Sequence, residues 1–111
     1  MTDIVHSSSS GNVFTDLGFS AVEAAELTAK SDLISAIDDT IRLRKLTQKA
    51  AANLCGTDQP TLSKVLRGRM ESVTIDRLAA WLAALGRTVE IRVRAYDAKA
   101  TACLTVVADA A

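Results

Sequence analysis

The sequence predicts a mainly α-helical domain, a bundle of four to five helices followed by a C-terminal β-strand. Two observations predict the helices: apolar residues recur at three- and four-residue spacing in two long stretches, and two short amphipathic stretches meet at Gly56. A third predicts the strand, because apolar and charged residues alternate across residues 88–95. At 111 residues, the chain has the length of one domain with one modest core.

The composition changes along the sequence and divides the chain into three parts. Residues 1–12 contain the run SSSSGN, which offers nothing to bury, so we expect a flexible N-terminal arm. Residues 13–95 hold all the periodic stretches and form the expected helical domain with its C-terminal strand. Residues 96–111 form a C-terminal tail, in which a further strand around residues 104–107 stays an open alternative.

The composition argues against several classes of protein. The hydrophobic fraction of 49% and charged fraction of 23% are typical of a globular protein, and no apolar run reaches the roughly 18 residues of a membrane span. The N-terminus lacks the pattern of a secretory signal, which favours the cytoplasm. Neither cysteine has metal-ligand spacing, and His6 is the only histidine. We therefore expect no metal, no cofactor and no enzymatic activity.

The formal net charge of zero conceals a segregation of charge along the chain. Residues 1–41 carry seven acids and one base, a balance of −6. Residues 42–69 carry seven bases and one acid, a balance of +6. Such asymmetry indicates a basic surface for nucleic acid or an acidic surface for a basic protein.

The first long helix is expected to begin at Ser20, which can cap it, with Glu23 as the capping-box partner. Apolar residues then recur on one face up to about Arg44, namely Leu27, Leu33, Ile34, Ile37 and Ile41. A second helix should start at Thr47 and run to Leu54, with three alanines that favour helix.

Gly56 is the expected stop of that second helix, because glycine enters the left-handed conformation without steric cost. Asp58 can cap a third helix, with Pro60 tolerated in its first turn and Gly68 at its end. Thr74 should start a fourth helix that ends at Gly86, with an apolar stripe of Leu78, Trp81, Leu82 and Leu85.

Two short helices joined by a tight glycine turn are typical of a helix-turn-helix. Leu62 and Val65 would pack the third helix onto the body, leaving a polar set on its outer side or leading end: Gln59, Pro60, Thr61, Ser63 and Lys64. Glutamine can bond bidentately to adenine in the major groove, and lysine can bond to guanine. The pattern therefore predicts DNA binding.

The stretch TQKAAANLCGTDQPTLSKVLRG, residues 47–68, resembles the helix-turn-helix of phage-repressor and Cro-like regulators, the XRE family. The flanks NVFTDLGF and IDRLAAWLAALGRTVEIRV are similar to those of HigA-like antitoxins, so the resemblance covers about residues 12–95. It implies a phage-repressor-like fold and a phosphate contact from Gln48. It also implies base contacts from Gln59, Thr61 and Lys64, with Ser63 on either base or phosphate and Arg67 and Arg69 on the DNA backbone.

Two functions compete for this domain. The first is a dimeric repressor that binds an inverted-repeat operator in double-stranded DNA. The second is an antitoxin that neutralises a cognate toxin protein and regulates its own operon. Because residues 13–40 are acidic, they are the expected toxin-facing surface, with a solvated helix face as the alternative.

The alternating segment TVEIRVRA predicts how a homodimer would form. A strand without a partner in its own chain invites pairing with another molecule, here through the apolar row Val89, Ile91 and Val93. The competing arrangement is a hairpin in which residues 102–107 fold back and pair with the strand.

Overall fold

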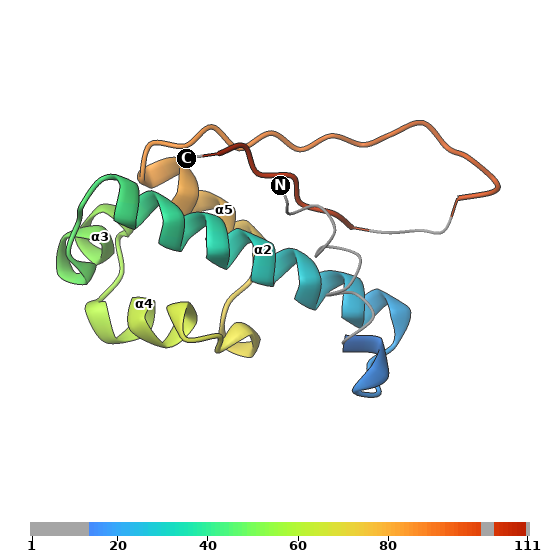
Figure 1. Cartoon of the computed structure of the whole chain (residues 1–111), viewed down its shortest axis with the longest axis horizontal. Helices are drawn as coiled ribbons and strands as arrows, with labels where there is room; N and C mark the ends of the chain where they lie inside the picture. The colour runs from blue at the N-terminus through green and yellow to red at the C-terminus, as the bar shows by residue number, and fades with distance from the viewer. Residues whose placement is uncertain (1–13, 101–103, 111) are drawn as a thin grey trace.

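The computed structural model describes residues 14–100 and 104–110. The arm expected for residues 1–12 lies outside these residues. The described chain begins with a helical turn at residues 14–16, and α2 forms the long axis of the molecule, with α4 and α5 on opposite sides of it (Figure 1). The bounds of the elements that follow the first turn are Ala21–Leu43 for α2, Gln48–Cys55 for α3, Gln59–Leu66 for α4, Met70–Ser72 for the 3-10 helix η1 and Ile75–Ala84 for α5.

Each of the predicted helix starts is confirmed, because the predicted side chain satisfies a free backbone N–H. Ser20 and Glu23 form a reciprocal capping box at α2, with hydrogen bonds of 3.0 and 3.1 Å. Threonine caps begin α3 and α5, with the side chains of Thr47 and Thr74 accepting from the N–H three residues on. Asp58 caps α4 by accepting from the N–H of Thr61 at 2.7 Å.

One apolar core joins the four main helices. Its fully buried side chains include Ile37 from α2, Leu62 from α4 and Leu78 from α5, each 0% exposed. Ala51 and Ala52 of α3 are also buried, and their small size allows α3 to lie close to its neighbours. Val73, just before α5, is a further core residue that the periodic pattern does not single out. The core therefore holds α3 and α4 at a fixed angle to α2 and α5.

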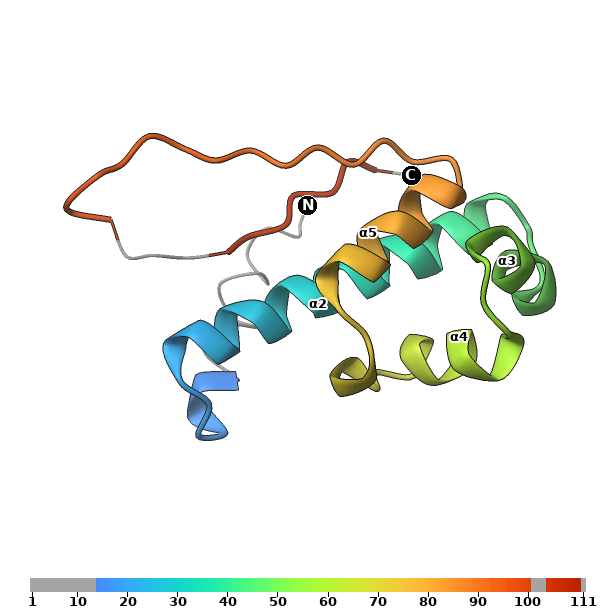
Figure 2. The ribbon, with the colours of Figure 1, turned by 180° about the vertical axis from the view of Figure 1, so that it is seen from behind.

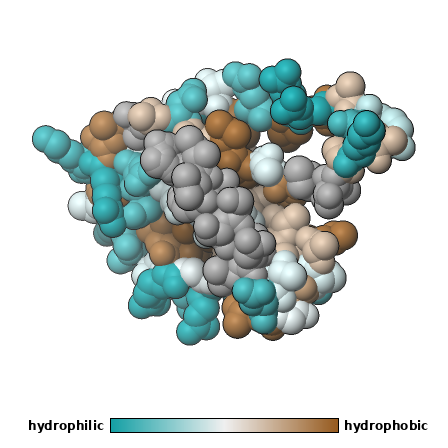
Figure 3. Space-filling view, turned by 45° about the vertical axis from the view of Figure 1, so that its right-hand side comes forward, coloured by the Kyte–Doolittle hydropathy of each residue, from teal (hydrophilic) through white to brown (hydrophobic). Residues whose placement is uncertain are grey.

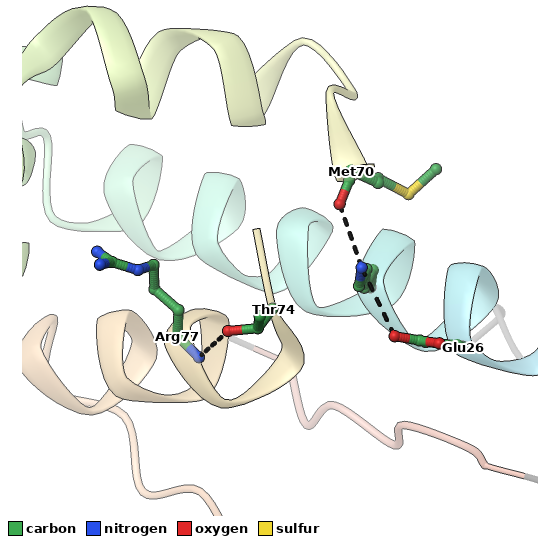
Figure 4. A network of polar contacts seen from close by, with 5 residues as sticks. Glu26, Met70, Thr74 and Arg77 are labelled. Carbon is green, nitrogen blue, oxygen red and sulfur yellow. Dashed lines mark hydrogen bonds and ion pairs between the residues drawn. The ribbon is translucent and has the colours of Figure 1, made fainter. Parts of the chain in front are cut away.

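Two basic side chains, Lys30 in α2 and Arg44 directly after it, tie distant parts of the chain together. The Lys30 ammonium donates to the carbonyl of Met70 at 3.3 Å and forms an ion pair with Glu26 at 3.7 Å, which connects α2 to η1 (Figure 4). The guanidinium of Arg44 donates to the carbonyl of Leu85 at 2.9 Å, which connects the end of α2 to the end of α5. These contacts fix both ends of the helical body.

The predicted C-terminal strand is not found, which corrects the expectation for residues 88–95. That segment runs extended past the end of α5, but no strand ladder occurs anywhere in the described residues (Figures 1 and 2). The alternative hairpin, in which residues 102–107 pair with this segment, is also not found for its described residues. Residues 104–107 are extended but form no strand pair. A strand exists only through hydrogen bonds to a neighbouring strand, and residues 14–100 and 104–110 supply none.

Candidate nucleic-acid interface

The α4 helix has two chemically distinct faces. Leu62 and Val65, 0% and 1% exposed, point into the core, and Leu66 packs against it. On the other side, Gln59 and Lys64 are exposed and Ser63 is half-buried. The inner face therefore positions the helix, and the polar outer face is free to contact a ligand.

Four-residue spacing sorts the outer residues into stripes. Gln59, Ser63 and Arg67 follow one stripe, and Pro60 and Lys64 lie beside it. Thr61 is also exposed, and its backbone N–H donates to the Asp58 carboxylate. The structure thus leaves each predicted α4 residue at least partly accessible to solvent.

Basic side chains border this outer face. Arg67 and Arg69 are exposed on either side of Gly68, directly after α4, and Lys49 is exposed in the first turn of α3 beside the half-buried Gln48. Within the described part of the chain, no carboxylate forms an ion pair with Lys49, Lys64 or either of these arginines. The charge of Lys64 interacts with that of Asp58, whereas the charges of Lys49, Arg67 and Arg69 remain available to phosphate. The sequence pattern alone does not single out Lys49.

Two other bases of the segment contact the chain itself. Arg42 forms an ion pair with Asp38 at 2.9 Å, and Arg44 is bonded to the carbonyl of Leu85. The balance of +6 in residues 42–69 therefore overstates the charge available at the α4 face. The distinction depends on three-dimensional contacts, so the charge count could not reveal it.

The N-termini of α3 and α4 differ in whether they can accept an anion. The α4 start is occupied by the Asp58 carboxylate, whose hydrogen bonds from Thr61 hold its pKa below the ordinary value and keep it ionised. A phosphate is repelled there. The α3 start is capped by the neutral Thr47, so its positive end, next to Gln48 and Lys49, suits a phosphate. The start of α3 can therefore accept an anion, and the start of α4 cannot.

The described residues form neither a metal-ligand cluster nor a membrane span. Residues 14–100 and 104–110 contain no group of three potential metal ligands, and Cys55 is a half-buried free thiol whose pKa is raised by burial. None of the helices in these ranges has the length and apolar character needed to span a bilayer.

The chain is similar in sequence and in structure to known DNA-binding domains. Residues 13–94 match a family described as a helix-turn-helix domain. A solved structure assigned to the XRE family of transcriptional regulators is 34% identical, with a TM-score of 0.71, and the alignment covers 78% of this chain and 99% of that chain. No protein with a curated description matches.

Proposed function

The chain belongs to the helix-turn-helix regulators of the XRE family, and from this premise we propose that it is a DNA-binding transcriptional repressor. In this proposal α4 lies in the major groove of an inverted-repeat operator, and two copies bind the two half-sites as a homodimer. The protein would act in the cytoplasm, where its partner is double-stranded DNA.

The two-faced character of α4 carries this proposal. Three bases lie close together on this side, Lys64 on α4 and Arg67 and Arg69 directly after it, and none of them forms an ion pair within the described residues. A continuous polar and basic surface on a rigid helix has the properties needed to fit a major groove.

The outer residues then have distinct expected roles. Gln59, Thr61 and Lys64 contact base edges, and Ser63 contacts a base or a phosphate. Pro60 offers only apolar contact, which suits the methyl group of thymine. Arg67, Arg69 and Gln48 contact phosphates, and Lys49 adds a further charge beside Gln48.

Loss of a base contact should weaken specific binding selectively. We expect Gln59→Ala and Lys64→Ala each to cost about 1–3 kcal/mol of operator binding and to relax the preference at one base position per half-site. Both side chains are exposed, so the fold should not change. Titration of each variant against the operator and against substituted operators measures the effect. Equal losses on operator and random DNA would contradict base reading by α4.

Loss of a phosphate contact should weaken binding to all sequences alike. Arg67→Ala is expected to reduce the slope of log affinity against log salt by about one per protomer, because one fewer counterion is released. Arg77→Ala is a matched control, since Arg77 is exposed on α5, on the other side of α2 from α4 (Figures 1 and 4). An unchanged slope for Arg67→Ala, or an equal change for Arg77→Ala, would show that Arg67 does not contact DNA.

We keep the antitoxin as a second candidate because of a surface near the start of α2. Leu17, Phe19 and Val22 are 69%, 41% and 78% exposed, beside the exposed acids Asp16 and Glu23. An apolar patch with acidic neighbours suits a basic protein partner. Two other acids of the region are neutralised, because Glu26 pairs with Lys30 and Asp38 pairs with Arg42.

Charge reversal tests the antitoxin better than truncation, because removing residues 1–40 would delete Ile37 and most of α2 from the core. We expect Asp16→Lys combined with Val22→Lys to abolish protection against a co-expressed basic ribonuclease-like toxin from a neighbouring gene. Operator binding should be unaffected. Full protection by this variant would exclude the surface as the toxin site.

A further inference from the structure

An open groove lies between the C-terminal segment and the helices. Its two walls are the extended segments 87–92 and 104–110, and its volume is about 690 Å³. Its floor consists of apolar side chains from two helices, Leu33 and Ala36 of α2 and Ile75, Ala79 and Leu82 of α5. Figure 2 shows the two segments running along the same side of the helical body without closing on each other.

Both walls of the groove have unpaired backbone. In the described residues, neither 88–96 nor 104–110 takes part in a backbone–backbone hydrogen bond. The walls are tied at one end, where the guanidinium of Arg87 donates to the carbonyl of Asp109 at 2.9 Å and to the hydroxyl of Thr40 at 3.0 Å. The groove thus combines an apolar floor with two free strand edges, which act as templates for another strand.

Two apolar side chains of the segment 88–95 are also left largely uncovered. Ile91 and Val93 are 88% and 90% exposed, although they belong to the apolar row of the alternating segment. Hydrophobic atoms lie directly beneath hydrophilic ones along the upper edge of the molecule, where this segment runs (Figure 3). A second apolar strand laid beside this segment would cover these side chains.

We propose that the groove receives the segment 88–95 of a second copy of the chain, which pairs antiparallel with the same segment of the first. The arrangement is reciprocal about a two-fold axis, so each copy fills the groove of the other. Segment 104–110 of each copy then pairs with the free edge of the inserted strand. This inference rests on the homodimer of the proposed function and identifies the surface that forms it.

The charges of the segment select one register for this pair. With the two-fold axis at Ile91, that residue faces the partner's Ile91, and Val89 faces the partner's Val93. Glu90 then faces the partner's Arg92, and the symmetry repeats this ion pair on the other side. The five central opposed pairs, from residue 89 to residue 93, are each apolar with apolar or acid with base, which stabilises a sheet, and the flanking Thr88 faces the partner's Arg94 without a charge conflict.

Neighbouring registers are unfavourable. An axis at Glu90 places two glutamates opposite each other, and an axis at Arg92 places two arginines opposite each other, which destabilises the pair. An axis between residues would place charged side chains on the same face as the apolar row. Among these neighbouring registers, only the one centred on Ile91 avoids both conflicts.

Cysteine cross-linking tests the register. With Cys55→Ala and Cys103→Ser removing the native thiols, Ile91→Cys should give mostly disulfide-linked dimer under mild oxidation. Opposed Cα atoms lie about 4.5–5.5 Å apart, which a disulfide spans. Val93→Cys is the matched control, because its copies would lie about 13 Å apart along the strands. Linkage at position 93 but not at 91 would overturn the register.

A charge-swap cycle tests the ion pair independently. Glu90→Arg should weaken dimerisation about 10-fold or more, because it places arginine opposite the partner's Arg92 twice. Adding Arg92→Glu should restore the dimer to within a few-fold of the wild type. If the double variant shows no rescue while its helical circular dichroism is unchanged, the ion pair and its register are overturned.

Filling the groove tests where the partner strand lies. Ala79→Trp projects into the floor and should give a monomer in sedimentation at concentrations where the wild type is a dimer. Ala80→Trp, on the exposed side of the same helix, should remain dimeric. A dimeric Ala79→Trp would overturn the placement of the partner strand in the groove.

Two further outcomes separate this inference from the proposed function. A wild-type monomer at micromolar concentration overturns the homodimer itself. A dimer linked at position 91 that binds no DNA supports the groove and contradicts the regulator function.

Discussion

The Ile91→Pro variant is expected to be a folded monomer that has lost most of its affinity for the operator. In the single chain Ile91 is 88% exposed and its backbone makes no backbone–backbone hydrogen bond to the described residues, so the helical body should not be affected. In the dimer, proline removes a ladder donor and an apolar contact at the centre of the strand pair. Two subunits bound together gain about 100-fold to 10,000-fold over one, and this gain should be lost.

Sedimentation and operator titration measure the two parts of this prediction. Ala98→Pro is the matched control, because it lies in the turn closed by the hydrogen bond from Ala100 to Asp97, at a position that favours proline. It should remain dimeric with wild-type affinity. A dimeric Ile91→Pro with unchanged mass would show that the segment 88–95 does not hold the two copies together.

The Leu62→Ala variant is expected to lose about 2–5 kcal/mol of the free energy of unfolding, because it leaves a cavity beneath α4. Leu62 is 0% exposed and belongs to the core shared by the helices. Domains of this size are stable by about 5–15 kcal/mol, so the variant should unfold at much lower temperature or denaturant concentration. Operator binding should fall only in proportion to the unfolded fraction, because the outer face of α4 keeps its residues.

Denaturant titration by circular dichroism measures this loss. Leu54→Ala on α3 is the control, since Leu54 is 45% exposed and its removal should cost less than about 1 kcal/mol. Equal costs for the two variants would contradict the burial of Leu62. Loss of DNA binding by fully folded Leu62→Ala would contradict the assignment of separate roles to the two faces of α4.

The helices were predictable because their signals are local. Each cap and stop depends on residues within one turn, as with the Ser20–Glu23 box and with Gly56, which has φ +72° at the end of α3. The apolar spacing of α4 likewise determines which side faces the core, and hence which residues are free to contact DNA. These features need no knowledge of distant parts of the chain.

The remaining features depend on contacts that a sequence pattern does not contain. The alternation at residues 88–95 correctly predicts an extended segment, but a strand also requires a hydrogen-bonded neighbour, which the described chain does not provide. Likewise, the sequence shows that Arg42 and Arg44 are positively charged. It does not show that Arg42 forms an ion pair with Asp38 or that Arg44 donates to the carbonyl of Leu85. The burial of Lys30 against Met70 links residues forty positions apart.

Selection of bound duplexes from a random DNA pool tests the central claim most directly, that α4 reads DNA sequence in the major groove as one half of a symmetric pair. The wild type should enrich an inverted repeat with half-site centres about 34–36 Å apart, one turn of the double helix. Selection with Gln59→Ala should enrich the same repeat with one position per half-site relaxed. Enrichment of no sequence by the wild type, or of an identical motif by both proteins, would contradict the account.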